Sequence, residues 1–582
     1  MNTSDPKFEI RFVPSSPTDS PSAFYTKRDK KSEVLHEGYI DREGALPLPC
    51  DIAADYDVPV RMRDGVVMYT NIYRPASATG QLPAIIVWSP YGKDGGYYHL
   101  DRFPGRLGIP NERLSNLQKF EGPDPAYWCA HGYAVVQPDS RGTYGSEGNV
   151  HFWGRQERED GYDFIEWLAG QGWCSGKIGM AGNSWLSIAQ WNIASECPPH
   201  LTAIAPWEGN SDFYQFTVPG GIPSVAFVKE LTQHMYGGQN TEDIISVVKG
   251  APLRDAYWLD KAPPVERIRI PMYTVASYTN PIHSVTTFKA FRRAASPEKW
   301  LRINNRMEWV DFYDEENQAD LRRFFDRYLK GVDNGWEKTP RVRHTVLDLR
   351  GNDVIDRPEA DFPLPSTRYT RLYLDAAGQS MSTAPAEKAA SASYVADDGK
   401  GAATFEFTAD RDIEISGYIK LKLWVEAQGA DDMDLFAVLQ KLDAEGRVLY
   451  HKSLPDHGMP EEAKAFLRLT PMFNGYSGCG YRLRVSLREL DPDASTPWEP
   501  VLPFIRTQKL RANEVVPLEM PLGPTGILVC KGEKLRLTVA GHEVDLPLMP
   551  GFEIRDTLNR GHHVLHTGAL RDAHLLLPFI EV

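Results

Sequence analysis

The feature that most constrains this sequence is a regular alternation of strand-like and helix-like segments between about residues 82 and 331. Continuous apolar runs, typical of strands buried on both faces, alternate with segments whose apolar residues recur at helical spacing. The clearest strand-like runs are LPAIIVWSPYG (82–92), GYAVVQPDSRG (132–142), LTAIAPWEG (201–209) and IPMYTVASYTN (270–280). This alternation predicts an α/β domain built on a parallel sheet that helices cover on both faces.

The residue composition and the pattern of apolar residues change along the chain and divide it into parts. Residues 1–50 are rich in Ser, Pro and charge, and they predict an N-terminal extension. The α/β pattern fills residues 51–345, interrupted at about 209–268 by a Gly-rich stretch with mixed helical signals. We interpret this stretch as an insertion over the carboxyl edge of the sheet, where ligands bind in such folds. Residues 346–582 contain short alternating strands separated by turn residues, which predict a separate β domain.

Composition excludes several classes of function. The net charge of −14 argues against nucleic acid or an anionic membrane surface as the main partner. The six cysteines show neither CxxC nor metal-ligand spacing, so we expect reduced thiols in a reducing compartment. No apolar run approaches the roughly 18 residues of a membrane span, and the N-terminus does not resemble a signal peptide. The sequence therefore predicts a cytoplasmic protein without a membrane segment.

The stretch KIGMAGNSWLSIAQW (177–191) has the pattern of a nucleophile elbow. An apolar strand stops at Gly182, Ser184 follows after one residue, and the apolar residues then change to helical spacing. A serine at a sharp strand-to-helix turn is the nucleophile arrangement of one class of hydrolases. The second glycine of the usual motif is replaced by Leu186, so on the motif alone a structural turn remains an alternative.

Several separated motifs, in this order, resemble the cocaine-esterase / X-Pro dipeptidyl-peptidase (CocE/NonD) family of α/β-hydrolases. They are SPYGK (89–93), DSRGTYGSEG (139–148), QEREDGYDFIEWLAGQGWCSGKIGMAGNSW (156–185), APWEG (205–209), GYRLRVSLRELDP (480–492) and GEKLRLTVAGHE (532–543). The resemblance covers nearly the whole chain past about residue 50. It implies an α/β-hydrolase catalytic domain with a helical cap insertion, followed by a C-terminal β jelly-roll domain.

The resemblance also implies roles for particular residues. Ser184 matches the nucleophile, and the backbone N–H of Trp185 would point into the oxyanion hole. Tyr91 in SPYG matches the tyrosine whose hydroxyl is the second donor to the developing oxyanion. Such a donor can lower the barrier by roughly 3 kcal/mol. Packing at the end of a strand is the alternative role for Tyr91.

Four charged residues near these motifs favour a structural interpretation. Asp139 stands at a strand end close to Arg141, whereas Glu157 and Asp160 stand near the start of a helix-like segment. This pattern predicts a buried ion pair and favourable electrostatics at a helix N-terminus.

The sequence departs from the family where the serine's partners are expected. Asn280 occupies the place of the acid and Glu308 that of the histidine. With a reference pKa of about 4.3, a glutamate is a poor base for a serine hydroxyl. The nearest histidine is His283, and none follows it before His344. We therefore expect an exchanged triad, in which His283 is the base and Glu308 its orienting acid.

Two alternatives to the exchanged triad stay open. One is the loss of hydrolysis, with the pocket kept for binding or for another acid–base reaction. The other is a histidine from elsewhere, such as His99 or His151. A lone histidine at a helix start is more often a capping or surface residue than a base. The assignment of His283 as the base therefore rests mainly on the absence of a histidine at the position usual for the family.

The function predicted from the sequence is a serine hydrolase or acyl-transfer enzyme. It would act on a small-molecule ester, amide or related acyl compound through an acyl intermediate at Ser184. The alternative is a hydrolase-fold protein that catalyses a non-hydrolytic step, such as cyclisation or proton transfer on a polyketide-like or peptide-like substrate, or only binds it. No P-loop, dinucleotide fingerprint or HExxH motif occurs, so we expect neither metal nor organic cofactor. Homo-oligomerisation is left open.

Overall fold

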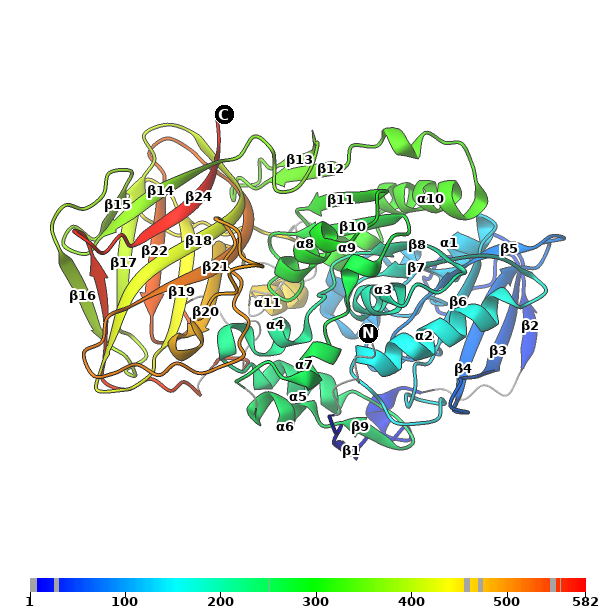
Figure 1. Cartoon of the computed structure of the whole chain (residues 1–582). Helices are drawn as coiled ribbons and strands as arrows, with labels where there is room; N and C mark the ends of the chain where they lie inside the picture. The colour runs from blue at the N-terminus through cyan, green and yellow to red at the C-terminus, as the bar shows by residue number, and fades with distance from the viewer. Residues whose placement is uncertain are drawn as a thin grey trace.

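The computed structural model describes residues 8–25, 31–250, 252–454, 461–468, 475–544, 551–554 and 556–581. The chain forms an α/β domain and a β domain that lie side by side (Figure 1). In the part of the chain that is described, none of the helices combines the length and the apolar character that crossing a membrane requires. The six cysteines are all free thiols.

An eleven-stranded sheet organises the α/β domain, in the order β13-β12-β11-β10-β8-β7-β5-β6-β4-β3-β2. Its parallel centre is β5 (Leu82–Ile86), β6 (Ala134–Pro138), β7 (Cys174–Gly182), β8 (Leu201–Pro206), β10 (Met272–Ser277), β11 (Lys299–Asn304) and β12 (Val342–Val346). The antiparallel edges are β2 (Ser32–Leu35), β3 (Ile52–Arg61), β4 (Val67–Pro75) and β13 (Val354–Glu359). The predicted parallel sheet is confirmed. Because β7 lies in the middle of this sheet, the turn that follows it stands at the carboxyl edge beside the ends of neighbouring strands, where ligands bind in such folds.

Helices cover the sheet as the alternation predicted (Figure 1). The helices α2 (Gly154–Ala169) and α3 (Trp185–Ser195) pack against each other and on β7. The long helix α10 (Glu315–Lys330) also packs on β7 and β8, and α8 (Ser284–Arg293) packs on β10. Two short helices, α1 (Pro125–Ala130) and α9 (Glu308–Phe312), complete the domain.

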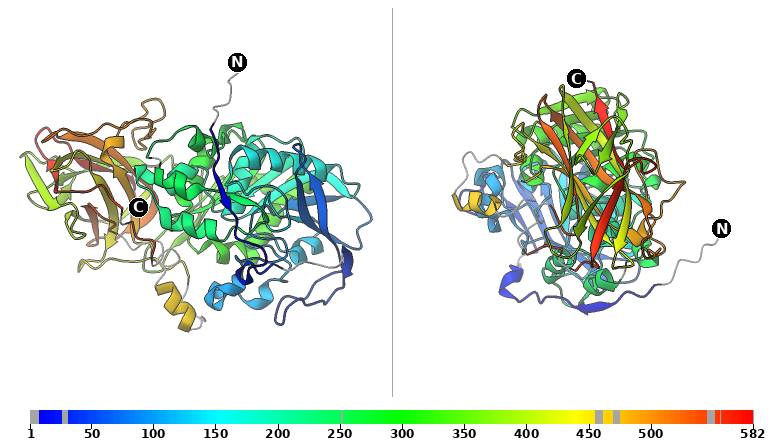
Figure 2. Two further views of the ribbon diagram at one scale, coloured as in Figure 1. Left: turned by 90° about the horizontal axis from the view of Figure 1, so that it is seen from below. Right: turned by 90° about the vertical axis from the view of Figure 1, so that its left-hand side faces the viewer.

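A helical cap follows β8, as predicted. It consists of α4 (Phe213–Thr217), α5 (Val225–Gln233), β9 (Asn240–Glu242), α6 (Ile244–Gly250) and α7 (Ala256–Asp260). The N-terminal extension is packed on the body, because β1 (Phe12–Pro14) pairs with β9 and β2 pairs with β3. Figure 2 shows the extension, in dark blue, running across the cap. Residues 1–7 and 26–30 of the extension lie outside the described residues.

The sequence predicts a buried ion pair near Arg141, and the structure forms one, but the partner is Asp160 rather than the nearby Asp139. Asp139 instead accepts from the backbone N–H of Lys93 at 2.7 Å. Nε and Nη2 of Arg141 donate to the two carboxylate oxygens of Asp160 on α2, at 2.7 and 2.6 Å. Glu157, in the first turn of α2, instead accepts from the indole N–H groups of Trp88 and Trp185, at 3.0 and 3.2 Å. This contact fixes the Trp185 side chain between α2 and α3, so that only the backbone of Trp185 is available at the elbow.

The second domain consists mainly of β-strands, as predicted, but it begins later than residue 346, because β13 pairs with β12 in the sheet of the α/β domain. The long β18 (Ile413–Gln428) pairs with β21 (Val516–Val529), β23 (His562–Thr567) and β24 (His574–Ile580). The other strands are β14 (Arg368–Asp375), β15 (Ser380–Ser382), β16 (Ala390–Val395), β17 (Ala402–Thr408), β19 (Asp434–Leu442), β20 (Gly478–Arg484) and β22 (Lys534–Ala540), and α11 (Glu461–Arg468) is a helix in this part of the chain.

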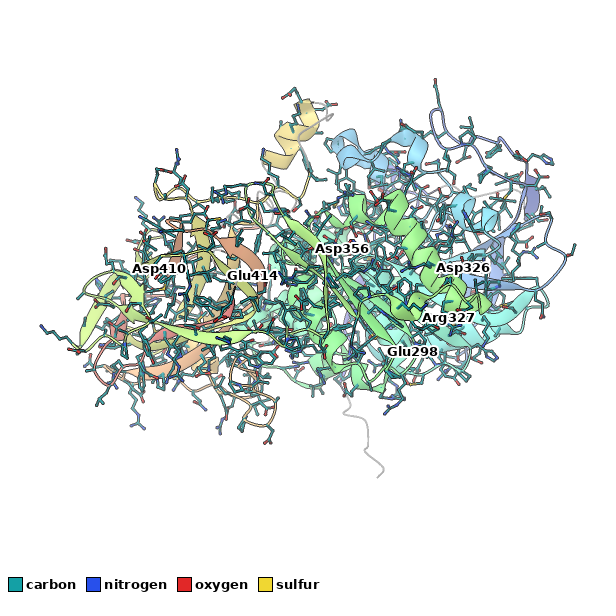
Figure 3. All side chains as sticks on the ribbon, turned by 90° about the horizontal axis from the view of Figure 1, so that it is seen from above. Glu298, Asp326, Arg327, Asp356, Asp410 and Glu414 are labelled. Carbon is teal, nitrogen blue, oxygen red and sulfur yellow. The ribbon has the colours of Figure 1, made fainter. Side chains whose placement is uncertain are left out.

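Backbone and charged contacts join the two domains. The N–H of Leu347, after β12, donates to the carbonyl of Gly526 in β21 at 2.8 Å. Arg357 of β13 binds Glu414 of β18 through two hydrogen bonds of 2.7 Å each, and Figure 3 shows Glu414 at the border between the domains. Burial alone would raise the pKa of Glu414, but hydrogen bonds from Arg357 and Ser416 bring it below its ordinary value.

Glu414→Gln should therefore destabilise the protein, by about 2 kcal/mol at neutral pH, because it removes charge-assisted hydrogen bonds from a buried site. The lowered pKa means that the stabilisation is present above the ordinary carboxyl pKa of about 4.3 and is lost as the pH falls through the folded value. Thermal unfolding between neutral pH and pH 3 measures both effects. Glu581→Gln, which alters the exposed Arg368–Glu581 pair, is the control. Equal melting temperatures for the two variants would contradict the prediction.

Candidate active site

Ser184 stands at a strained turn between β7 and α3. Its backbone has φ 51° and ψ −120°, which is the left-handed side of conformational space and is rarely occupied by serine. Two carbonyls pin the turn: the N–H of Ser184 donates to Glu208 at 2.8 Å, and that of Asn183 donates to Glu121 at 3.2 Å. The turn also requires a glycine, because a Cβ on Gly182 would lie 2.4 Å from the Leu186 side chain.

Tyr91 and Trp185 lie on either side of this turn. Burial raises the pKa of the Tyr91 phenol well above 10, and hydrogen bonding to Ser184 lowers it only in part. The Tyr91 ring packs against Trp185, Tyr98 and Phe120 at centroid distances of 6.4, 5.0 and 5.4 Å. Trp185 is the first residue of α3, so its N–H has no acceptor within the helix. A neutral phenol and a spare backbone N–H beside Ser184 have the chemistry of an oxyanion hole.

Glu121 is a third polar group beside Ser184, and the sequence did not point to it. Its Oε1 accepts from the Trp309 indole at 2.7 Å. Burial raises the pKa of Glu121 to about 8, and hydrogen bonds from Trp309 and Tyr91 lower it in part. Glu121 therefore places a carboxyl that is largely protonated at neutral pH near the Tyr91 phenol.

The loop after β10 and the start of α9 bring the two substituted positions together. Nδ2 of Asn280 donates to Oε2 of Glu308 at 2.7 Å, while Oδ1 of Asn280 accepts from the backbone N–H of His283 at 3.2 Å. Nε2 of His283 lies 3.7 Å from the same Oε2, which is beyond hydrogen-bond distance. The Glu308 carbonyl also accepts from the Asn183 side chain at 2.9 Å, which ties Glu308 to the elbow.

Burial shifts the pKa values of both members of this pair toward their neutral forms. Burial lowers the pKa of His283 to about 3. Burial and the nearby Glu121 and Glu208 raise the pKa of Glu308 well above 4.5, against the hydrogen bond from Asn280. His283 and Glu308 are thus neighbours, as the exchanged triad requires, but Nδ1 of His283 is buried and has no hydrogen-bond partner among the described residues.

Glu208 is the second carboxyl that sequence reasoning passed over. It belongs to the APWEG motif, directly after β8, so its place at the carboxyl edge of the sheet was a usable signal. Burial raises the pKa of Glu208 to about 8, and hydrogen bonds from Ser277 and Asn304 lower it in part. Glu121, Glu208 and Glu308 together give the site three buried carboxyls that tend to keep their protons.

The other candidate histidines are engaged in different parts of the domain. His99 caps a short 3₁₀ helix, where its Nδ1 accepts from the backbone N–H of Asp101 at 3.3 Å. His151 packs edge-on against Phe12 of the N-terminal extension, at 5.2 Å between ring centroids. Within the described residues, no group of three or more His, Cys, Asp and Glu side chains is arranged to hold a metal ion.

Comparison with known proteins identifies the family. The sequence pattern of X-Pro dipeptidyl-peptidases (S15 family) matches residues 64–242, and that of their C-terminal non-catalytic domain matches residues 334–576. A CocE/NonD family hydrolase from Staphylococcus aureus is 36% identical, with a TM-score of 0.83, over 91% of this chain and 94% of that one. This chain belongs to the CocE/NonD family of hydrolases. The membership supports a serine esterase or peptidase, and it confirms the α/β-hydrolase fold.

Two further proteins illustrate the range of similarity. The cocaine esterase of Rhodococcus sp. is 27% identical over 55% of this chain, and the match spans less than two thirds of the esterase, 62%. An aminopeptidase from a marine sediment archaeon, Thaumarchaeota archaeon, shares the fold at a TM-score of 0.63 and 16% identity, over 97% of this chain and 99% of that one. Asn280, His283 and Glu308 lie between the two ranges that the family patterns match.

Tyr91→Phe keeps the ring packing but removes the hydroxyl that faces Ser184. If the phenol donates to the oxyanion, kcat for ester turnover should fall by roughly 10²–10³ with little change in KM, because the hydrogen bond strengthens only in the transition state. Steady-state kinetics with a 4-nitrophenyl ester measures this change. Tyr98→Phe, which removes a neighbouring hydroxyl, is the matched control. An unchanged kcat in Tyr91→Phe would leave Tyr91 with packing alone.

Proposed function

We propose that this CocE/NonD hydrolase cleaves a small-molecule ester or amide, or transfers its acyl group, through an acyl intermediate on Ser184. The observation that carries the proposal is the strained Ser184 turn, which holds the hydroxyl beside the Tyr91 phenol and the N-terminus of α3. Strain of this kind persists only where the surrounding structure enforces it, and it is concentrated at functional sites.

In the proposed reaction, Oγ of Ser184 attacks the carbonyl carbon while its proton passes to a base. The Tyr91 hydroxyl and the Trp185 N–H stabilise the oxyanion of the tetrahedral intermediate. This intermediate expels the alcohol or amine, which takes up the proton, and leaves an acyl-serine. Water, or another nucleophile in the case of acyl transfer, then attacks the acyl-serine by the reverse sequence.

His283, with Glu308 as its orienting acid, is the proposed base. Burial keeps the imidazole neutral with a pKa of about 3, so it becomes an effective base only when ionised Glu308 raises that pKa. Ionised Glu308 would stabilise the imidazolium, and Asn280 holds its carboxyl in position. The 3.7 Å separation has to shorten when substrate binds, as catalytic hydrogen bonds often do. Since the pKa of Glu308 is raised, this relay should gain activity as the pH rises.

A second candidate function is a non-hydrolytic proton transfer, such as a cyclisation step. The three buried carboxyls Glu121, Glu208 and Glu308 favour it, because their raised pKa values suit them to donate and accept protons near neutral pH. This reaction would not require an acyl-serine, so labelling of Ser184 separates the two candidates.

A fluorophosphonate should form a covalent adduct at Ser184, because the reagent reacts with an activated serine. Intact-mass analysis and peptide mapping identify the adduct. Ser184→Ala should lose both the adduct and ester turnover, while its melting temperature stays within a few degrees of the parent protein. Ser187→Ala, which alters a buried serine one turn along α3, is the control and should still be labelled. A parent protein that resists labelling would favour the proton-transfer function.

The base is tested by a pair of variants and their combination. His283→Ala should cost about as much activity as Ser184→Ala, and the double variant little more, because members of one proton relay are strongly non-additive. Glu308→Gln should cost less but should remove the rise of activity with pH. Full activity in His283→Ala would exclude the exchanged triad. If Asn280→Asp combined with Glu308→His then gains ester hydrolysis that the parent protein lacks, the parent pocket serves another reaction.

A further inference from the structure

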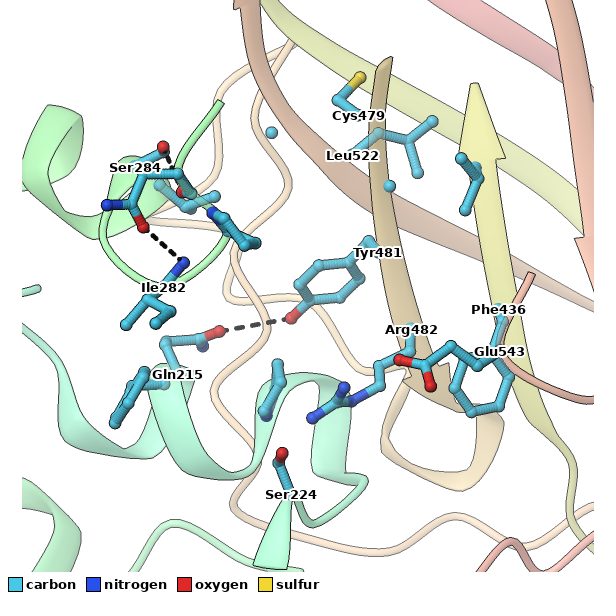
Figure 4. A pocket seen from close by; sticks show the side chains of 18 of the residues that line it. Gln215, Ser224, Ile282, Ser284, Phe436, Cys479, Tyr481, Arg482, Leu522 and Glu543 are labelled. Atoms are coloured by element: carbon cyan, nitrogen blue, oxygen red, sulfur yellow. Dashed lines mark hydrogen bonds between the residues drawn. The ribbon is translucent and has the colours of Figure 1, made fainter. Parts of the chain in front are cut away.

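A cavity of about 370 Å³ lies between the cap and the β domain, beside the loop that follows β10 (Figure 4). The cap contributes Gln215 and aromatic side chains to its wall, and β19 and β20 form the opposite side. The lining includes the aromatic residues Phe216, Phe227, Phe436, Tyr481 and Phe552. Its volume is in the range of pockets for small organic ligands.

Arg482 of β20 lines this cavity with a poorly compensated positive charge. Figure 4 shows its side chain reaching from the strand toward Ser224 and the cap. Its Nε is buried and has no hydrogen-bond partner among the described residues. Burial lowers the pKa of Arg482 to about 10, and the attraction of Glu543 offsets this only in part.

Glu543 is the other charged residue in the described lining, and it is already engaged. Its Oε2 accepts from the backbone N–H of Ile554 at 3.3 Å. A guanidinium in a low-dielectric wall is costly unless an anion pairs with it. A planar carboxylate matches the fork of guanidinium donors and would also occupy the unpartnered Nε.

We propose that this cavity binds the carboxylate of a small organic acid with an apolar or aromatic body, and that Arg482 is the group that recognises it. The aromatic lining accommodates the body of the ligand, and Arg482 fixes its charged end. The carboxylate belongs either to the far end of the substrate, in which case this inference rests on the proposed function, or to a separate acid bound beside the site.

One residue connects the cavity to the candidate active site. Asn280 lines the cavity, and its Nδ2 donates to Oε2 of Glu308 at 2.7 Å. Its neighbours Ile282 and Ser284 line the same wall. Ser184 and Tyr91 do not belong to the described lining, and the loop that carries Asn280 and His283 borders both the cavity and the candidate active site.

Binding is tested in the full-length Ser184→Ala chain, so that no result depends on catalysis. By isothermal titration calorimetry, 4-phenylbutyrate should bind, and Arg482→Met should weaken it at least about tenfold, as expected for a charge-assisted pair. The neutral 4-phenylbutyramide should bind more weakly than the acid, and equally to both chains. Arg506→Met, which removes an exposed arginine paired with Glu489, is the matched control and should bind like Ser184→Ala.

Thermal unfolding shows whether Arg482→Met is still folded, so that a loss of structure is not mistaken for a loss of binding. Arg482→Met should melt at the same temperature as the parent chain or higher, because it removes a partly buried charge that forms no ion pair among the described residues. Absence of 4-phenylbutyrate binding to the folded Ser184→Ala chain would overturn the proposal. Equal affinity of Arg482→Met and the control for 4-phenylbutyrate would overturn it as well.

The source of the carboxylate is decided with two esters on the chain that retains Ser184. A substrate carboxylate predicts that Arg482→Met lowers kcat/KM for mono-4-nitrophenyl adipate at least about tenfold but leaves 4-nitrophenyl hexanoate unchanged. A separate acid predicts Arg482-dependent binding of 4-phenylbutyrate with equal effects on the two esters. If neither ester is cleaved and Ser184 resists labelling, the proposed function fails, while the calorimetric result still decides whether the cavity binds carboxylates.

Discussion

The candidate site depends on the backbone hydrogen bond from Ser184 to the Glu208 carbonyl, at 2.8 Å. A serine at φ 51° costs about 1–3 kcal/mol, so the turn survives only because its neighbours hold it. Glu208 holds it from the end of β8, and Glu121 holds it through Asn183. The same two residues bury their carboxyl groups in the site. The backbone geometry of the nucleophile and the electrostatics around it therefore have a common origin.

Burial also changes the acid–base properties of Glu308, which occupies one of the substituted positions, and of His283. In water, Glu308 would be a weak base and His283 a moderate one. Inside the domain, burial raises the pKa of Glu308 and lowers that of His283, which favours the neutral form of each side chain. Asn280 suits this arrangement because its amide donates to the Glu308 carboxyl without adding another acid to the cluster. An aspartate at the same position would add a fourth acidic group.

Contacts between the two domains also help to hold the candidate site in place. The Leu347 contact with Gly526 and the Arg357–Glu414 pair fix the β domain against the sheet. As a result, β20 faces the loop that carries Asn280 and encloses the cavity. The position of Glu308 and the shape of the cavity consequently depend on how the β domain is docked.

The sequence alone determined the parallel sheet, the cap, the elbow at Ser184 and the β domain, because periodicity and turn residues are local properties of the chain. It also identified the departure at Asn280 and Glu308, but not Asp160 as the partner of Arg141. Only the tertiary structure brought Glu121 and Glu208 to the elbow and Arg482 to the cavity. Their protonation and their contacts depend on burial and on residues distant in sequence, and neither is encoded in a local pattern.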